Sequence, residues 1–338
     1  AILQNKGLCS IPRDNVSASG NVSMDKSRQF HEARLSIPDT TGRFLVGCQS
    51  EIKRYDLKNR KAETVISGMA SSPRCMFKDK NGGLWIGVED DGIAYCPLKA
   101  SSFEHRFAGK NITALAKDKG GNIWAGTVSG ELFRIDSHGE TTSLAIPEIS
   151  SIQCLMADSR ELWIGTRYDG LFIHNLDNGK TTNHRYDRYK DSSISDNCVT
   201  ALFKDSAGKI YVGTEWGLSY YSKETGGFIS EPRASNHSSV TGFFEDSKKN
   251  IWILSSNDGL YRTTLDGKIW KDFNTSKTNS LTSNTTYDMV EDNKGLIWVA
   301  TASGLVTYSY ESNTFSPVNQ ELASGSISSL EKDSYGRI

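Results

Sequence analysis

The chain has 338 residues and a formal net charge of −1, with 39 basic and 40 acidic residues. This balance provides no basic surface field, which argues against nucleic-acid binding. No apolar run approaches the ~20 residues that a membrane-spanning helix needs, and the apolar start at residues 1–3 is too brief for a signal peptide.

A unit of about 40 residues recurs from one end of the chain to the other. Its clearest copy, residues 118–127, reads Asp-Lys-Gly-Gly-Asn-Ile-Trp-Ala-Gly-Thr. A period of this length in a pattern of strands is typical of β-propeller blades, and no helical periodicity accompanies it. The copies begin at Asp39, Asp79, Asp118, Asp158, Asp205, Asp246 and Asp292, and an eighth begins at Asp333.

Each copy divides into four strands, which in the third copy are residues 112–117, 122–127, 131–136 and 140–146. The Asp-x-x-Gly link between the first two predicts a short hairpin, with glycine at a positive φ. The fourth copy is one residue shorter, so its hairpin should differ in type. Apolar residues on both faces of the first strand predict burial on both sides, and the aromatic column is expected to fill the space between blades.

The sequence therefore predicts an all-β fold, a seven-bladed β-propeller with four-stranded blades plus the start of a further blade at the C-terminus. We expect the propeller at residues 1–312, including an N-terminal segment at 1–30. Residues 2–8 would close the ring as an outer strand beside residues 304–310. Residues 313–338 would be the truncated start of a second propeller. The alternative is an eight-bladed ring whose last blade is shared by both chain ends.

The first strands of the copies carry one aspartate and two cysteines that need an explanation. Asp288 occupies a position that is small in most other copies, where it faces a water-filled channel or coordinates a ligand, and water is the favoured interpretation. Cys75 and Cys154 share one register two blades apart, which argues against a bond between them. The six cysteines show no Cys-x-x-Cys spacing and are interpreted as small buried residues, with their disulfide status left open.

Candidate ligand residues lie in the loops that join the two middle strands of each blade, because propeller ligands bind where these loops emerge. A sugar needs a flat apolar platform and polar groups for its hydroxyls. The aspartates, which precede glycines, are interpreted first as turn formers, and the basic-aromatic segment 183–190 as a solvated strand with its loop. The predicted ligand-binding residues are Arg167, Tyr168, Asp169, Glu215, Trp216, Asn257 and Asp258.

Long connections at residues 189–197 and 274–284 each end in asparagine just before an apolar strand. Four sequence features follow one another here. They are a Ser-Leu-x-x-Asn-like lead, a strand ending in Glu-Asp or Lys-Asp, the motif Gly-x-Ile-Trp-x-x-Thr and the motif x-Gly-Leu-x-x-Tyr. This combination resembles the two-component regulator propeller repeat over about residues 33–338. The first copy departs from it with Leu45 in place of tryptophan, and the sixth with Leu254 and Ser255 in place of Gly-Thr.

The resemblance implies the extracytoplasmic, periplasmic sensor region of a hybrid two-component system of the kind found in gut Bacteroidetes. It implies a second propeller, a β-sandwich, a membrane helix, a histidine kinase, a receiver and a DNA-binding module beyond this chain. The implied partners are an oligosaccharide or other small ligand and a second copy that forms a homodimer through sensor domains. The fragment itself is expected to need no cofactor, to hold no metal, to catalyse no reaction and to touch the membrane only through later segments.

Two other functions compete with this interpretation. The first is a non-enzymatic propeller that binds a protein or dimerises without sensing a small molecule. The second is an enzyme, either a glycosidase or a lyase. Sialidase Asp-boxes place glycine two and tryptophan five residues after the aspartate, whereas the offsets here are three and six. The six histidines fall mostly at outer or turn positions, which does not suit the metal-assisted base of a propeller lyase.

Overall fold

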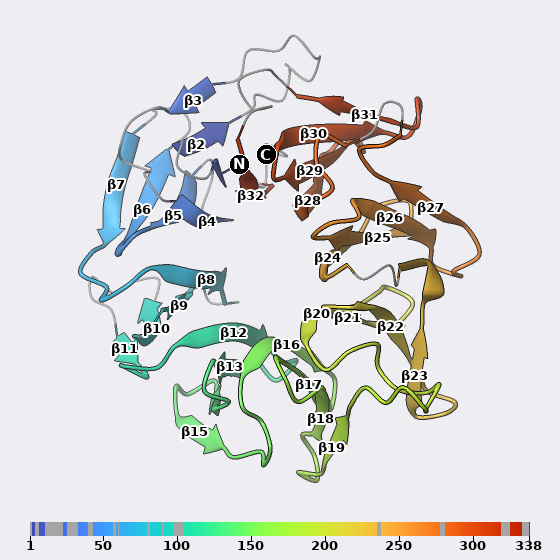
Figure 1. The fold of residues 1–338 in the computed structure, drawn as a ribbon. Coiled ribbons are helices and arrows are strands. Elements are labelled where there is room, and N and C mark those ends of the chain that lie inside the picture. The colour runs from blue at the N-terminus through green and yellow to red at the C-terminus, as the bar shows by residue number, and fades with distance from the viewer. Residues whose placement is uncertain are drawn as a thin grey trace. The chain divides into compact units, whose positions relative to one another are not determined.

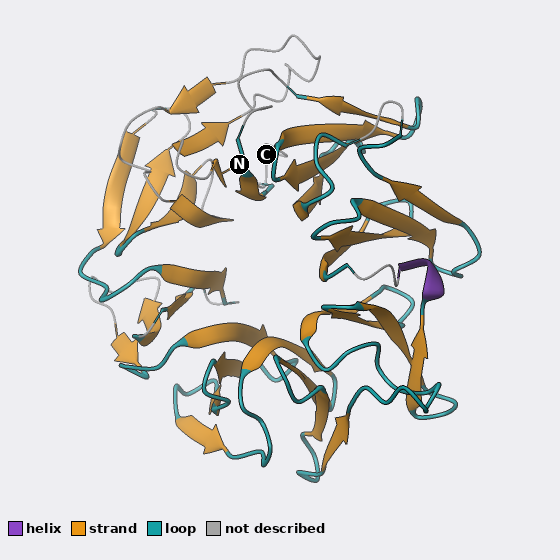
Figure 2. Ribbon diagram, viewed as in Figure 1, coloured by secondary structure: helices purple, strands orange, loops and turns teal. Residues whose placement is uncertain are grey.

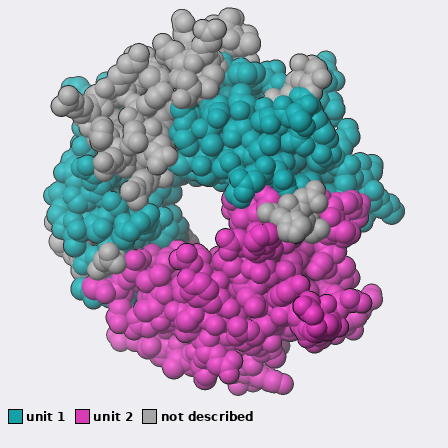
Figure 3. Space-filling view, in the orientation of Figure 1, with its two compact units in different colours: residues 1–108, 246–338 teal, residues 109–245 magenta. Residues whose placement is uncertain are grey.

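The computed structural model describes residues 2–3, 7–10, 23–25, 33–39, 43–56, 59, 61–79, 82–89, 91–96, 104–234, 238–277, 281–318, 325–332 and 338. These residues form strands and turns, with a single-turn 3-10 helix, η2, at Pro232–Ala234 (Figure 2). The chain divides into two compact units, residues 109–245 and residues 1–108 together with 246–338 (Figure 3). Asp333, where the eighth copy begins, lies outside the described residues, as do His31 and His237 of the six histidines.

The unit of residues 109–245 holds three complete antiparallel blades in chain order, green to yellow in Figure 1. The four strands predicted for the third copy are all present, each within two residues of its expected ends. The strands are β12 (Ile112–Lys117), β13 (Ile123–Thr127), β14 (Leu132–Ile135) and β15 (Thr141–Leu144), then β16 (Ile152–Asp158), β17 (Glu161–Thr166), β18 (Leu171–Asn175) and β19 (Thr181–His184), then β20 (Val199–Lys204), β21 (Ile210–Thr214), β22 (Gly217–Ser222) and β23 (Gly227–Ser230), followed by β24 (Val240–Glu245).

The other unit holds the first, second and seventh blades and three strands of the sixth sheet. Seven four-stranded sheets thus follow the seven complete copies, and the predicted all-β, seven-bladed propeller is confirmed. The strands of this unit are β4 (Ala33–Pro38), β5 (Arg43–Cys48), β6 (Glu51–Asp56) and β7 (Lys61–Ile66), then β8 (Pro73–Lys78), β9 (Leu84–Val88), β10 (Gly92–Cys96) and β11 (Glu104–Arg106), then β25 (Asn250–Ser255), β26 (Leu260–Thr264) and β27 (Trp270–Phe273), and β28 (Thr286–Glu291), β29 (Ile297–Thr301), β30 (Gly304–Ser309) and β31 (Thr314–Pro317).

The chain ends form a further four-stranded sheet with the order β3–β2–β1–β32. It combines β1 (Ile2–Leu3), β2 (Gly7–Ser10) and β3 (Ser23–Asp25) with the extra C-terminal strand β32 (Ile327–Ser329). The pairing predicted between residues 2–8 and 304–310 is wrong, because β31 already occupies the outer edge of β30. Instead β1 pairs with β2, with Ile2 opposite Leu8. The seventh blade also runs to Pro317, past the boundary expected at residue 312.

Each Asp-x-x-Gly hairpin is closed by its aspartate. In the third copy, Asn122 N donates 2.9 Å to Asp118 Oδ1, and Trp124 Nε1 donates 3.0 Å to Asp118 Oδ2. Gly121 takes the predicted positive φ, 87°. One carboxylate therefore satisfies the turn backbone and fixes the indole six residues later. This accounts for the six-residue spacing from the aspartate to the aromatic residue in these copies. The same pairs join Asp79 to Trp85, Asp246 to Trp252 and Asp292 to Trp298, and Tyr211 donates to Asp205.

The two copies that lack this pair are bridged differently. In the first copy Leu45 has no side-chain N–H, and Asp39 accepts hydrogen bonds from Arg54 Nε (2.6 Å) and Lys78 Nζ (2.5 Å). Burial opposes ionisation of Asp39, but these two cations lower its pKa below the ordinary value. In the shorter fourth copy, Trp163 donates 3.1 Å to Glu161 instead, and Asp158 accepts from Lys204 Nζ at 2.5 Å.

These two lysines connect their blades to the preceding ones. Lys78 and Lys204 both directly precede an aspartate that opens a hairpin, and each reaches the hairpin of the copy before its own. Glutamates at the same position contact backbone donors there instead: Ser206 N donates 2.7 Å to Glu245, and Ser247 N donates 2.6 Å to Glu291. At this position a lysine contacts a carboxylate of the neighbouring hairpin, and a glutamate contacts a backbone amide. Both kinds of residue therefore connect neighbouring blades.

The aromatic column lies between neighbouring blades, as predicted. Trp163, fully buried, packs edge-on against Tyr221 and Phe228 of the next blade, with ring centroids 5.2 and 6.4 Å away. The expectation that the first strand is buried on both sides is wrong. The second strand, such as β13 or β21, is buried throughout, whereas β16 and β20 keep intermediate exposure beyond their first residue. The first strand is a sheet edge, paired on one side only, so it remains less covered.

The C-terminal strand β32 lies beside β28 (Figure 1), and Asp288 of β28 holds the residue that follows β32. Its carboxylate accepts hydrogen bonds from Met289 N at 2.8 Å and from Leu330 N at 2.7 Å, just after β32. Burial raises the pKa of Asp288, while these donors oppose that rise. The carboxylate is thus held by the backbone amides of Met289 and Leu330 together with the side chain of Ser329.

Candidate functional site

The first predicted loop joins β17 to β18 and presents an aromatic ring to solvent. Tyr168 is 58% exposed, and the guanidinium carbon of Arg167 lies 5.5 Å from its ring centroid. Arg167 N donates 3.0 Å to Ser151 O, which fixes the start of the loop. The loop ends at Gly170, whose φ of 84° an L side chain rarely adopts. The exposed ring and its cation are therefore held on a fixed backbone.

Asp169 in the same loop is mainly a structural anchor. Its Oδ2 accepts hydrogen bonds from Ser150 N at 2.8 Å and from Ser150 Oγ at 2.6 Å. Its Oδ1 lies 3.8 Å from Arg185 Nη1. These contacts favour the turn-forming interpretation of the aspartate, because the carboxylate ties its loop to the segment before β16.

The second predicted loop joins β21 to β22 and carries Glu215 and Trp216. Trp216 is 51% exposed and lies outside the buried aromatic column. Its backbone N donates 3.3 Å to Thr214 Oγ1, and Glu215 N donates 2.9 Å to Cys198 O. The two loops of this unit thus offer one exposed ring each, on short turns between buried strands.

Cys198, which the sequence did not single out as a site residue, lies where these loops meet. Burial raises the pKa of its thiol to about 11, and the charge and hydrogen bond of Glu215 act in the same direction, while Arg167 acts in the opposite one. Residues from both loops therefore act on one thiol. Arg167 and Glu215 thus both act on this thiol, and each is next in sequence to an exposed ring, Tyr168 or Trp216.

The long connection 185–197 supports the first loop from outside. Asn197 O accepts 3.0 Å from Gly170 N, and its Oδ1 accepts 2.8 Å from Tyr186 N. Arg185 Nη2 donates 3.2 Å to Tyr168 O. Tyr186 and Tyr189 of this connection are exposed. The asparagine that ends the connection was the sequence signal for this support, whereas Arg185 lies in the segment 183–190, which the sequence favoured as a solvated strand with its loop.

The third predicted loop, Asn257 and Asp258 between β25 and β26, belongs to the other compact unit. Asp258 N donates 2.9 Å to Ser255 Oγ, and its carboxylate accepts 3.2 Å from Tyr261 OH. Gly259 N donates 2.8 Å to Asn284 O, and Asn284 Oδ1 accepts 2.8 Å from Thr275 N. Asn284 thus repeats the role of Asn197. Within this unit, Asp258 is a turn residue.

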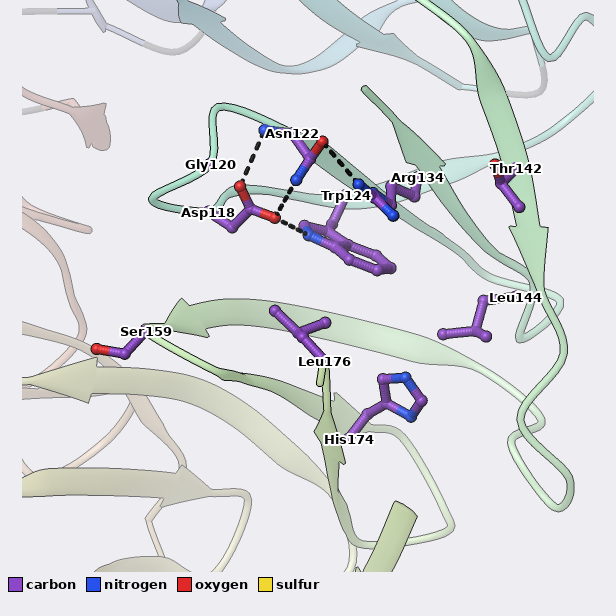
Figure 4. Close-up of a pocket in the computed structure, with 10 residues that line it drawn as sticks. All are labelled: Asp118, Gly120, Asn122, Trp124, Arg134, Thr142, Leu144, Ser159, His174 and Leu176. Atoms are coloured by element: carbon purple, nitrogen blue, oxygen red, sulfur yellow. Dashed lines mark hydrogen bonds between the residues drawn. The ribbon is translucent and has the colours of Figure 1, made fainter. Parts of the chain in front are cut away.

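A pocket of about 350 Å³ lies elsewhere in the unit of residues 109–245 (Figure 4). It lies beside the hairpin of the third copy, and residues of the third and fourth blades line it. The described residues contain no cluster of three or more histidine, cysteine or acidic side chains suited to a metal ion. No helix among them is long and apolar enough to span a membrane. The pocket-lining residues are Asp118, Gly120, Asn122, Trp124, Arg134, Thr142, Leu144, Ser159, His174 and Leu176.

The sequence matches the model of the two-component regulator propeller repeat at residues 106–129, 193–216 and 280–303. Each matched segment runs from the approach to a blade's first strand, through the aspartate hairpin, to the loop after the second strand. The chain therefore contains two-component regulator propeller repeats. The second of these repeats includes Asn197, Cys198, Glu215 and Trp216. No curated protein matches the sequence.

Several solved structures have a similar fold. The extracellular domain of the putative hybrid two-component system BT4673 from B. thetaiotaomicron aligns with 18% identity and a TM-score of 0.58, covering 82% of this chain and 44% of that one. PorZ, a surface component of the type-IX secretion system of Porphyromonas gingivalis, aligns with 18% identity and a TM-score of 0.59, covering 85% and 47%. The designed protein Ika8 aligns with 13% identity and a TM-score of 0.65, covering 85% and 87%.

This chain thus spans less than half the length of the BT4673 and PorZ chains to which it aligns. At these identities the likeness concerns the fold. The similarity to an extracellular domain of a two-component system agrees with the repeat match, and both agree with the family resemblance of the sequence.

Proposed function

We propose that this chain is the ligand-sensing part of the periplasmic region of a hybrid two-component system, and that its ligand is an oligosaccharide. The observation that carries the proposal is the pair of exposed rings, Tyr168 and Trp216, on neighbouring loops that converge on Cys198. Both rings lie outside the column that packs the blades, so neither is needed to fill the core.

The chemistry of these loops suits a sugar. The C–H face of a pyranose stacks on a flat ring, and its hydroxyls need donors and acceptors close to that ring. Arg167 supplies donors beside Tyr168, and Glu215 supplies acceptors beside Trp216. In this proposal Asp169 acts by holding the first loop, and Asn257 and Asp258 of the other unit remain additional ligand residues.

The signalling role rests on the repeat match and on the kinship it implies. We propose that ligand binding is relayed to a histidine kinase in the remainder of the protein and that two copies pair through their sensor regions. This segment would bind without catalysing a reaction.

Thermal melting and calorimetry against a panel of plant and host oligosaccharides test the proposal. One glycan should raise the melting temperature, and Trp216→Ala should weaken its binding at least about tenfold, as expected when a central aromatic contact is lost. Ile269→Ala, which truncates an exposed apolar side chain on a turn of the other unit, is the control and should bind normally.

The same experiment separates sensing from a purely structural role. If no glycan in the panel binds while sedimentation shows concentration-dependent dimers, the chain is an interaction propeller and the sensing proposal fails. If a glycan binds equally well to Trp216→Ala and to the unaltered protein, the ligand site is elsewhere on the molecule.

A further inference from the structure

The pocket beside Trp124 lies at a blade junction that lacks two aromatic side chains present at two other junctions. At the next junction, Tyr221 and Phe228 face each other across β22 and β23 and pack against Trp163. The strand registers show that His174 corresponds to Tyr221. Tyr221 comes directly after Tyr220, which lies opposite the column residue Tyr211. His174 comes directly after Ile173, which lies opposite the column residue Trp163.

His174 faces Thr181 across β18 and β19, so this pair occupies the place of Tyr221 and Phe228. The other unit shows the filled version again, where Tyr308 and Phe315 pack against Trp252 with centroids 5.1 and 6.5 Å away. An imidazole and a hydroxyethyl group occupy less space than two six-membered rings. The space beside Trp124 that they leave unfilled is the pocket of about 350 Å³.

His174 brings an unused polar atom to this space. The residue is only 6% exposed, and its Nδ1 lies 2.8 Å from Thr181 Oγ1. The Nε2 of His174 has no hydrogen-bond partner among the described residues, and it is not among their fully sealed side-chain atoms. It is therefore accessible, and the pocket is the space that His174 lines. A polar atom at such a position is open to a ligand or to water.

The charged groups of the pocket favour an anion. Asp118 already accepts hydrogen bonds from Asn122 N, Asn122 Nδ2 and Trp124 Nε1, at 2.9, 2.7 and 3.0 Å. Arg134 has five N–H donors and uses one of them on Asn122 Oδ1, at 3.1 Å, within the described residues. Figure 4 shows Arg134 beside Trp124, with Leu144, Leu176 and His174 around the same space. The donors of Arg134 are thus available, whereas the acceptors of Asp118 are largely used.

We propose that this pocket binds a small aromatic carboxylate. Its ring would occupy the space that tyrosine and phenylalanine fill at the junctions of Trp163 and Trp252, against Trp124, Leu144 and Leu176. Its carboxylate would accept hydrogen bonds from Arg134 and from the Nε2–H of His174, with Thr181 donating to Nδ1. The site is separate from the loops of Tyr168 and Trp216, and it does not depend on the sensing proposal.

Calorimetry with phenylacetate and with its neutral analogue phenylacetamide tests the site. Phenylacetate should bind saturably, and the amide should bind at least about tenfold more weakly, because a charge-assisted hydrogen bond to Arg134 is lost. Arg134→Gln should weaken phenylacetate to a similar extent and leave the amide unchanged. Arg160→Gln, at an exposed arginine paired with Asp177, is the matched control and should alter neither.

A second variant restores the filled junction. The double substitution His174→Tyr and Thr181→Phe should abolish phenylacetate binding and raise the melting temperature, since it fills a cavity with the residues used elsewhere in the chain. If this variant does not fold, the Arg134→Gln comparison decides. Failure of phenylacetate to bind, binding that survives in the folded double variant, or equal affinity for acid and amide would overturn the proposal.

Discussion

The indole Nε1 of Trp252 donates a hydrogen bond of 2.8 Å to Oδ2 of Asp246, and both side chains are buried. The other carboxylate oxygen accepts 2.9 Å from Asn250 N. A single acid therefore closes a hairpin and orients the largest ring of its blade. The aspartate and the aromatic residue six positions later, which recur in the sequence, are the two partners of this contact.

Asp246→Ala should destabilise the protein severely. The substitution leaves Asn250 N and Trp252 Nε1 buried without an acceptor, and each such loss costs about 1–3 kcal/mol. We expect the free energy of unfolding, measured by urea denaturation, to fall by about 3 kcal/mol. The exposed Asp177→Ala should change it by less than about 0.5 kcal/mol. Equal effects of the two substitutions would contradict the role assigned to the buried pair.

Lys204→Met should weaken the junction between the fourth and fifth blades. It removes the hydrogen-bonded ion pair with Asp158, whose partners are 32% and 18% exposed, so solvent limits the loss to about 1 kcal/mol. Lys117 occupies the same position in the third copy but is exposed and makes no ion pair within the described residues. Lys117→Met should therefore leave the free energy of unfolding unchanged, and a loss as large as that of Lys204→Met would argue against the contact.

Gly170→Ala should distort the loop of Tyr168. At a φ of 84° the added methyl would lie 2.3 Å from His184 O, in addition to the backbone strain. We expect a loss of about 3 kcal/mol in the free energy of unfolding and weaker ligand binding. Gly179 also has a positive φ, but no atom lies within 4 Å of its added methyl, so Gly179→Ala should cost about 1–2 kcal/mol. Similar losses at both sites would show that the contact with His184 is unimportant.

The C-terminal strand should be attached more weakly at alkaline pH. Burial raises the pKa of Glu331 to about 7, and the nearby Asp288 acts in the same direction. Because the folded-state pKa lies above the ordinary value of 4.5, this contribution to stability is complete below about pH 4.5 and is lost as the pH rises through 7. Glu331→Gln should therefore raise the melting temperature at pH 8 but not at pH 5. The exposed Glu224→Gln is the control, and an equal gain at both pH values would exclude the proposed titration.

Much of the fold could be predicted from the sequence because each blade is built from local contacts. The hydrogen bonds from Asp118 reach only four and six residues ahead, so the hairpin and its aromatic are encoded within one copy. The pairing of the chain ends was not predictable in this way. Ile2 lies opposite Ser329, and no local pattern specifies which edge a terminal strand takes.

The candidate site divides in the same manner. Tyr168 and Trp216 could be predicted because they are aromatic residues outside the regular column. The pocket at Trp124 could not, because it depends on the absence of large side chains at His174 and Thr181, which become neighbours of that ring only across a blade junction. A missing side chain gives no signal until the register of neighbouring strands is known.

The sequence by itself determined the repeating β unit, its aspartate hairpins and the exposed rings of its loops, because these follow from residues close together in the chain. Only the tertiary structure decided that Asp288 holds the C-terminal strand, that Cys198 lies between two loops, and that one blade junction is hollow. Those features arise from contacts between separate copies, whose energy depends on packing volume and on hydrogen-bond partners brought from distant positions.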